Sequence, residues 1–413
     1  MNKPIITKEH EEIDIKNCDL DKLQSFLKCK KLDAALKVTA KGIKTNSWVG
    51  AIKYKNTLFE ILPKCISDNK DENTLKNLIY MLSYTKNLDI KANDHAKLST
   101  LKNPFIEILI RVYAKSLFDC LKRLTPQKYV IHENNLNYLK GKIKFSENIR
   151  YNCANRAKFY CEYDEFSENN ILNKLFLYVT TCLYNISNNS YNKKTLKIIM
   201  NYYSDIEFVR FDKFDVKKIT LDRNQELFNK PFNLAKMFVE QTNVDMSKNR
   251  FENITLIWDM NQLFEEFIFE IMKKYETELD CKLTAQKGRK LLACDDSKRR
   301  NTFVDIMVER KKDGRRIVLD TKYKKFTSTD DLSNQDIYQI SSYCLIHKAN
   351  HAILLYPQWN STKPDVDYYL NIDNFENENK YHLYFKTIDL KYKDLKKNID
   401  LVKDEIKYIL DII

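Results

Sequence analysis

Two aspartates and a lysine in the last third of the chain have the side-chain types and the spacing of a metal-dependent hydrolytic site. Asp305 lies inside an apolar run, and Asp320 ends another, two residues before Lys322. Residues two apart in a strand point to the same face of a sheet, so Asp320 and Lys322 are expected to lie together. Mg²⁺ prefers carboxylate oxygens, and an ammonium group beside a metal-bound water can assist phosphodiester hydrolysis. A buried Asp–Lys pair on an ordinary sheet is the alternative that this spacing leaves open.

A turn is expected to bring the two aspartates together. Strands are predicted over 302–309 and 316–322, and the turn at 311–315 contains Gly314. Antiparallel pairing through this turn would place Asp305 and Asp320 toward the same end of the sheet. The surrounding pattern predicts an αβββαβ succession, a small mixed sheet flanked by helices. Its elements are a helix over 259–275, strands over about 282–293, 302–309 and 316–322, a helix over 333–347 and a strand over 351–356.

The first part of the chain is predicted to be a separate region. Runs at 48–54 and 58–64 form a β-hairpin, and helical spacing of apolar residues follows. A polar segment over 245–253 is predicted to be a linker. It divides the chain into an N-terminal region 1–250 and a C-terminal domain 251–413, and the expected fold class is α+β. The helices expected in the N-terminal region cover 74–86, 104–124, 169–184 and 225–243.

Composition excludes some functions and favours a polyanionic partner. Only five glycines occur in 413 residues, and none has the spacing of a standard nucleotide-binding loop. A requirement for ATP or GTP would therefore have to be met by another subunit. The 70 Lys and Arg exceed the 57 Asp and Glu by 13, and 14 basic against 6 acidic residues lie in 287–325. The candidate phosphate contacts in that segment are Arg299, Arg300, Arg315, Arg316, Lys324 and Lys325.

Cysteine usage and hydropathy indicate a reducing, cytoplasmic location. The ten cysteines include no CxxC pair, so neither a zinc ribbon nor an iron–sulfur site is predicted. There is no basic and apolar leader at the N-terminus and no apolar run near 18 residues, so we expect no membrane association.

These motifs together resemble a known nuclease core. Asp305 and the triplet Asp320-Thr321-Lys322, with Glu265 on the preceding helix and Gln339-x-x-x-Tyr343 on the following one, resemble the PD-(D/E)XK nucleases. Val304 stands where that motif often has proline. More narrowly, the chain is similar to the McrC family, the nuclease subunits of modification-dependent restriction systems. The stretches that carry this similarity are 60–64, 139–143, 161–174, 263–267, 319–324, 336–343 and 352–357.

The resemblance implies a role for each site residue. Asp305 and Asp320 would ligate Mg²⁺, with Mn²⁺ as a substitute, and Lys322 would position the attacking water. Glu265 would add a further carboxylate to the metal site. Glu266, one helical step away, is the alternative, and a surface salt bridge is the simpler explanation for Glu265.

The helix after the strands would contribute two more side chains. By the resemblance, Gln339 and Tyr343 would orient the active-site lysine or contact DNA, since residues four apart share a helix face. Ordinary packing of the helix on the sheet is the alternative.

The implied function is that of a Mg²⁺-dependent DNA endonuclease subunit that itself binds no nucleotide. In this family the partner is a hexameric AAA+ GTPase, McrB, and residues 1–250 would bind and stimulate it. Two other functions remain open, namely a non-catalytic adaptor that binds DNA or activates the partner, and a stand-alone DNA-repair nuclease of the same fold.

Overall fold

The computed structural model describes most of the chain, as an α+β protein with two compact units. Unit 1 combines residues 1–102 with 257–413, and unit 2 comprises 103–256. The junction at 256 lies close to the boundary predicted at 250, but the first hundred residues share a unit with the C-terminal part. In the described chain no helix is both long and apolar enough to span a membrane. The described residues are 5–14, 24–25, 28, 35–39, 42–54, 57–66, 71–85, 104–241, 253–294, 298–359, 366–369 and 381–413.

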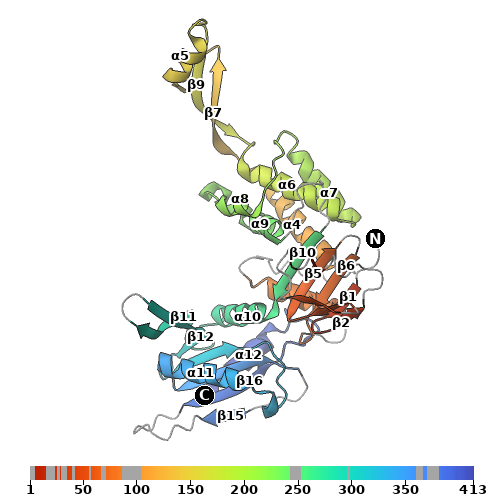
Figure 1. Cartoon of the computed structure of the whole chain (residues 1–413), viewed down its shortest axis with the longest axis vertical. Helices are drawn as coiled ribbons and strands as arrows, with labels where there is room; N and C mark the ends of the chain where they lie inside the picture. Colours follow the sequence, from red (N-terminus) through yellow and green to blue (C-terminus); the bar gives the residue numbers. More distant parts are fainter. Residues whose placement is uncertain are drawn as a thin grey trace. The chain divides into compact units, whose positions relative to one another are not determined.

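A six-stranded mixed sheet is the largest element of unit 1 (Figure 1). Its strand order is β11-β12-β13-β14-β16-β15, with parallel pairing of β13 with β14 and of β14 with β16 and antiparallel pairing elsewhere. The predicted αβββαβ succession is present as α10, β11, β12, β13, α11 and β14. The bounds are α10 Met260–Lys274, β11 Cys281–Cys294, β12 Lys298–Arg310, β13 Arg316–Thr321, α11 Asn334–His347, β14 His351–Pro357, β15 Val366–Tyr369, β16 His382–Ile388 and a final helix α12 Ile399–Asp411.

Helix α11 covers one face of this sheet. Met307 of β12 pairs with Val318 of β13, and both belong to one buried cluster with Ile340 and Cys344 of α11. Because side chains alternate along a strand, the residues two positions beyond this pair point to the same face. The α11 side of the sheet is therefore the side on which Asp305 and Asp320 lie.

The N-terminal part of unit 1 forms two smaller sheets. The predicted hairpin is confirmed as β5 and β6, although residues 55–56 of its turn lie outside the described residues. Strand β1 pairs in parallel with β6, and the sheet order is β1-β6-β5-β10. A second sheet has the order β2-β4-β3. The bounds are β1 Ile5–Lys8, β2 Glu12–Asp14, β3 Leu36–Val38, β4 Gly42–Thr45, β5 Trp48–Tyr54, β6 Thr57–Leu62, β10 Asn253–Asp259 and a helix α2 Asp71–Leu82.

Unit 2 is a group of helices joined to a small sheet. The helices pack through apolar faces, and at α6, α7 and α8 the side chain of the residue just before the helix binds free backbone N–H groups. For example, the Asn170 side chain accepts from the N–H groups of Leu172 and Asn173. The predicted linker over 245–253 lies almost entirely outside the described residues. The helices are α4 Phe105–Leu121, α6 Ile171–Ile186, α7 Ser190–Tyr202, α8 Lys213–Lys218, the short 3₁₀ helix η1 Arg223–Phe228 and α9 Asn229–Gln241.

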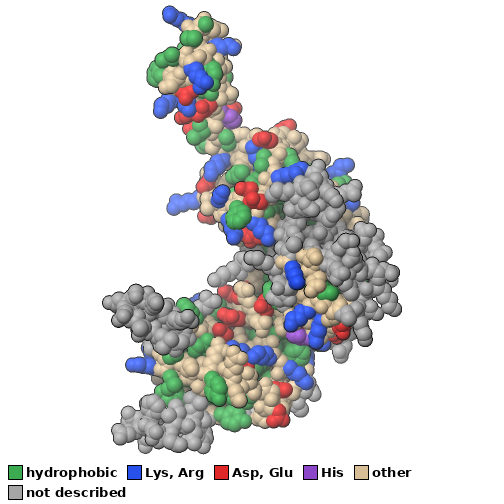
Figure 2. Space-filling view, viewed as in Figure 1, with side chains coloured by type: hydrophobic (Ala, Val, Ile, Leu, Met, Phe, Trp, Pro, Cys, Tyr) green, Lys and Arg blue, Asp and Glu red, His purple; other side chains and the backbone are tan. Residues whose placement is uncertain are grey.

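The small sheet of unit 2, residues 128–167, is called here the β7–β9 hairpin. Its strands β7 (Lys128–Leu136), β8 (Lys142–Ile143) and β9 (Phe159–Ser167) have the order β7-β9-β8, and α5 (Phe145–Asn152) precedes β9. Many of its large apolar side chains are exposed, and apolar patches are visible on it in Figure 2. These side chains are Tyr129, Ile131, Tyr138, Leu139, Phe145, Ile149, Tyr151 and Phe166.

Candidate active site

Asp305 and Asp320 meet on neighbouring strands. Ile306 pairs with Leu319, and one further step in this antiparallel register places Asp305 opposite Asp320. The turn predicted between the strands is present, with Gly314 at a φ of +69°. Beyond the paired residues, the Thr321 backbone N–H donates to Asp305 Oδ2 over 3.0 Å, which fixes this carboxyl group at the end of β13. The antiparallel arrangement expected from the turn is confirmed.

The two carboxyl groups form a pair in which negative charge is costly. Burial and the neighbouring Asp305 raise the pKa of Asp320, and burial also raises the pKa of Asp305. Asp320 is 1% exposed, and neither of its oxygens has a well-aligned hydrogen bond within the described chain. A buried carboxyl group without aligned hydrogen bonds, next to a second carboxyl group, fits a divalent cation, which would supply the missing interactions of Asp320 and offset the repulsion between the two groups.

Lys322 lies against this pair. Its Nζ atom is 2.7 Å from Asp320 Oδ2, a close ion pair without hydrogen-bond alignment. Burial disfavours the ammonium charge, but Asp320 and Asp305 outweigh this effect and raise the pKa of Lys322. The lysine is therefore held as a cation beside the carboxylates, in the position that the spacing of Asp320 and Lys322 predicted.

Helix α11 holds the lysine from the other side. Lys322 Nζ donates to Gln339 Oε1 over 3.0 Å, and Gln339 Nε2 donates to the Tyr343 hydroxyl over 2.7 Å. The fixed amide of Gln339 thus aims the ammonium group, and Tyr343 fixes the amide. The structure brings the two helix residues to the lysine, an arrangement compatible with the orienting role that the resemblance implies.

Asp336 belongs to this group of side chains but was missed by the sequence analysis. It is 5% exposed in the first turn of α11, and its carboxylate binds Lys324 Nζ over 2.8 and 3.0 Å. Its charge contributes to the raised pKa of Asp320. Its position three residues before Gln339, on the same helix face, was the available signal.

The structure does not place Glu265 in a cluster with the two aspartates. It lies half-buried on α10, and among the described residues no three His, Cys, Asp or Glu side chains come close enough to share an ion. Glu266, the alternative, accepts a hydrogen bond from Gln262 over 2.8 Å. The structure therefore brings together Asp305 and Asp320 alone of the three predicted carboxyl groups, and the role of Glu265 stays a prediction.

The basic residues chosen from the sequence are not gathered in one place. Arg316 begins β13, so it lies about 13 Å along the strand from Asp320 at about 3.3 Å per residue. Its guanidinium pairs with Glu309, and that of Arg315 pairs with Asp313. Lys324 and Lys325 are exposed just after Lys322. Arg299 and Arg300 lie in β12, but their side chains fall outside the described parts.

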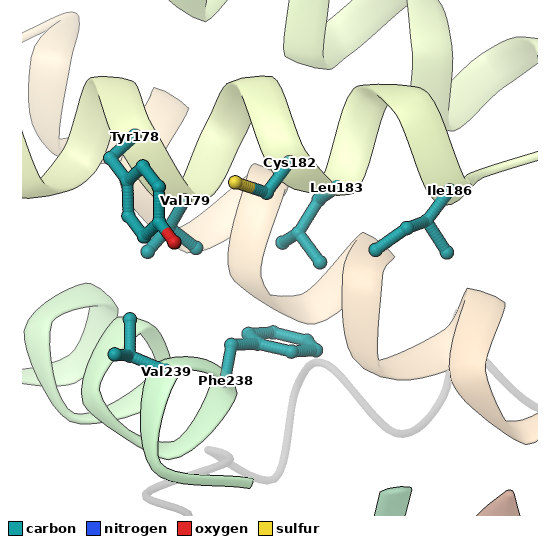
Figure 3. Close-up of a pocket in the computed structure, with 7 residues that line it drawn as sticks. All are labelled: Tyr178, Val179, Cys182, Leu183, Ile186, Phe238 and Val239. Carbon is teal, nitrogen blue, oxygen red and sulfur yellow. The ribbon is translucent and has the colours of Figure 1, made fainter. Parts of the chain in front are cut away.

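A pocket in unit 2 contains none of these residues. Figure 3 shows it between α6 and α9, lined mainly by apolar side chains. Its polar groups are the Tyr178 hydroxyl and the Cys182 thiol, and burial raises the pKa of both. The pocket therefore offers no charged group for catalysis.

Comparison with known proteins assigns the chain to a family. The family model for McrBC 5-methylcytosine restriction system components matches residues 43–357. The chain belongs to the McrBC family. The resemblance to McrC seen in the sequence is thereby confirmed. No curated protein matches this McrBC-family chain.

Two solved structures resemble this McrBC-family chain. One is from the refined half-complex of a tetradecameric assembly of Thermococcus gammatolerans McrB AAA+ hexamers with bound McrC, with 23% identity and a TM-score of 0.74 over 98% of this chain and 100% of the other. The other is from the cryo-EM structure of the Thermococcus gammatolerans McrBC complex, with 25% identity and a TM-score of 0.55 over 66% of this chain and 88% of the other. The first similarity shows a common fold over nearly the whole chain.

Proposed function

We propose that this chain is the Mg²⁺-dependent DNA endonuclease subunit of a McrBC-type restriction system. The observation that supports this most directly is the group formed by Asp305, Asp320 and Lys322, in which a half-buried lysine lies beside two carboxyl groups, and the oxygens of Asp320 have no aligned hydrogen bond within the described chain. On this proposal α10, β11–β13, α11 and β14 form a PD-(D/E)XK nuclease core.

The residues have separable roles in hydrolysis. Asp305 and Asp320 would hold Mg²⁺, or Mn²⁺ in its place, and the bound ion would lower the pKa of its water and polarise the phosphate. The Lys322 ammonium would orient the water and offset the negative charge that develops on the phosphate. Gln339 and Tyr343 would keep that ammonium in place, and Lys324 and Lys325 would contact the DNA backbone.

The proposed partner is an AAA+ GTPase. The similar structures are of assemblies that contain McrB and McrC, and none of the glycines of this chain has the spacing of a standard nucleotide-binding loop. We assign partner binding to the region 1–250, where the β7–β9 hairpin exposes aromatic and aliphatic side chains that suit a protein interface. The seven cysteines whose side chains the structure describes are free thiols, in keeping with the proposed action in the cytoplasm.

Cleavage of DNA by matched lysine variants tests the proposal. We expect Mg²⁺-dependent cleavage by the wild type with its AAA+ partner and GTP, and a loss of at least about a hundredfold in Lys322→Ala. Lys312→Ala, which removes an exposed turn lysine from the same unit, is the control and should cut normally.

Each other outcome points to a different function. Equal cleavage by the wild type and Lys322→Ala would refute the assigned site. Stimulation of partner GTP hydrolysis without any cleavage would indicate the adaptor. Efficient cleavage by the chain without a partner would indicate a stand-alone nuclease.

A further inference from the structure

A buried polar cluster surrounds the residue that directly follows Lys322. Tyr323 follows Lys322 directly, and its side chain is 3% exposed. Its hydroxyl accepts a hydrogen bond from Cys65 Sγ over 2.9 Å and donates one to Glu9 Oε1 over 2.5 Å. Both partners are fully buried, and the Lys64 backbone N–H also donates to Glu9 Oε1, over 2.7 Å. The Tyr323 hydroxyl therefore has a donor and an acceptor from the N-terminal part of unit 1.

These contacts connect the sheet of β1 and β6 to the strand end that carries Lys322. Glu9 directly follows β1, and Cys65 lies three residues beyond β6. On the other side, the Lys322 backbone N–H donates to the Leu355 carbonyl oxygen over 2.9 Å. A backbone hydrogen bond to β14 thus holds Lys322, and side-chain hydrogen bonds to residues just after β1 and β6 hold Tyr323, on the two sides of the peptide bond that joins them.

Aromatic packing extends this connection. The Tyr323 ring lies 6.0 Å from the Phe264 ring and 6.5 Å from the Trp359 ring, measured between centroids. The Trp359 indole N–H also donates to the Lys324 carbonyl oxygen over 2.9 Å. The segment after β13 is therefore fixed by side chains from three other parts of unit 1.

Burying the carboxyl group of Glu9 costs folding free energy, which an apolar side chain at this position would not. Burial raises its pKa to about 7, although the hydrogen bond from Tyr323 acts in the opposite direction. Within the described chain its second oxygen, Oε2, has no hydrogen-bond partner. An apolar side chain of similar volume would avoid this cost but could not accept the Tyr323 hydroxyl.

We propose that Glu9 is a positioning residue for the nuclease reaction, which holds the backbone of Lys322 in place through the Tyr323 hydroxyl. The proposal rests on the proposed function, because that function gives Lys322 its role in hydrolysis. It makes the β1–β6 sheet part of the machinery that sets the active-site geometry.

Cleavage kinetics of the full chain with its AAA+ partner give the first test. Tyr323→Phe keeps the ring but removes the hydroxyl, so we expect the rate at saturating DNA and Mg²⁺ to fall about tenfold while the half-saturating DNA concentration stays unchanged. Glu9→Met should have the same effect, whereas Glu9→Gln keeps an acceptor oxygen and should stay near the wild-type rate. Tyr384→Phe removes a hydroxyl that lies 3.3 Å from His351 Nδ1 in the same unit, and it is the matched control.

A different result would overturn the positioning role. If Tyr323→Phe or Glu9→Met only reduced the folded fraction, the rate per folded molecule would equal that of the wild type. A loss of rate in Glu9→Gln as large as in Glu9→Met would show that the charge, and not the hydrogen bond, matters.

Hydrogen exchange on the full chain without DNA gives a second test that needs no cleavage. The Lys322 and Lys324 N–H groups are hydrogen-bonded to the Leu355 and Lys322 carbonyl oxygens, over 2.9 and 2.8 Å. We expect both to exchange at least about fivefold faster in Tyr323→Phe and Glu9→Met, but not in Glu9→Gln or Tyr384→Phe. If Tyr323→Phe and Glu9→Met showed wild-type exchange and wild-type cleavage, the positioning role would be refuted but the proposed function would stand. A wild type that cuts no DNA would instead refute the proposed function.

Discussion

At the scale of single residues, the carboxyl pair of the proposed metal site lowers the stability of the fold. Asp305 and Asp320 are close together, both pKa values are raised by burial, and Lys322 compensates only part of the negative charge. A group whose pKa is raised on folding stabilises the fold below its ordinary pKa, and this contribution is lost as pH rises through the folded pKa.

Asp320→Asn should therefore stabilise the metal-free protein while abolishing its activity. The amide imitates the protonated carboxyl group, so the free energy of unfolding should rise by about 1 kcal/mol or more at pH 8 and by less at pH 4. Urea unfolding in EDTA measures this effect, and Mn²⁺ binding should be lost in the same variant. The control is Asp313→Asn, which should destabilise the protein because Arg310 holds the pKa of Asp313 well below its usual range. A lower stability of Asp320→Asn at pH 8 would contradict the electrostatic account.

Glu9 should give the protein a second pH dependence. Because burial raises its pKa from 4.5 to about 7, its contribution to stability is present below about pH 4.5 and is lost as pH rises to about 7. Over this pH range, the free energy of unfolding of the wild type should thus fall by up to about 3 kcal/mol relative to that of Glu9→Gln. Unfolding of both proteins at pH 4.5, 6 and 8 checks this, since other titrating groups cancel in the difference. A difference that did not change with pH would show that Glu9 titrates normally.

At the scale of elements, the β7–β9 hairpin depends on one glycine. Gly141 has a φ of +69°, and a Cβ atom there would lie 2.4 Å from the Glu162 carbonyl oxygen and 2.7 Å from Tyr163 Cβ. Both the backbone conformation and the close approach of β9 therefore require glycine.

Gly141→Ala should disrupt the hairpin without affecting the nuclease site. The strain and the overlap should destabilise the hairpin by about 2 kcal/mol or more. Limited proteolysis should then cut first within residues 128–167, and stimulation of partner GTP hydrolysis should fall. Gly314→Ala is the control, because Gly314 has the same φ but no atom within 4 Å of the added Cβ atom. Equal protease resistance of the wild type and Gly141→Ala would count against this explanation.

Local patterns in the sequence were enough to predict most elements around the site, but not its long-range contacts. The hydrophobic periodicity and Gly314 predicted β12, β13 and α11, and the two-residue spacing placed Lys322 beside Asp320. In contrast, the contact between Glu9 and Tyr323 joins residues 314 positions apart, and no local pattern reports such a pairing. Arg315 and Arg316 were predicted to contact phosphates near the site because they are close to it in sequence. The first and fifth residues of an extended strand, however, lie far apart in space.

At the scale of the whole molecule, unit 1 is formed by two segments that are distant in the chain. The Asn77 side chain donates to the Tyr392 carbonyl oxygen over 2.6 Å and accepts from the Leu395 backbone N–H over 2.9 Å. The Met260 backbone N–H donates to the Ser47 carbonyl oxygen over 2.9 Å. The last 157 residues therefore rely on the first hundred for part of their hydrogen bonding and burial.

A fragment of residues 251–413, the domain predicted from the sequence, should therefore fold poorly on its own. Without residues 1–102 it exposes Tyr323 and loses both partners of the Tyr323 hydroxyl. A chain that joins 1–102 to 251–413 through a flexible linker should unfold cooperatively, which thermal denaturation followed by circular dichroism would show. The expectation fails if the fragment 251–413 has the same thermal midpoint as the joined chain.

The division of unit 1 between two distant segments also sets the order of events on the ribosome. Residues 1–102 are synthesised first, but the strands that complete their unit follow only after the 154 residues of 103–256. At roughly 5–20 residues per second, this delay is about 8–30 s, during which the early segment has only part of its core. Asp305, Asp320 and Lys322 emerge later still, so the proposed nuclease site is assembled only after unit 2 has had time to fold.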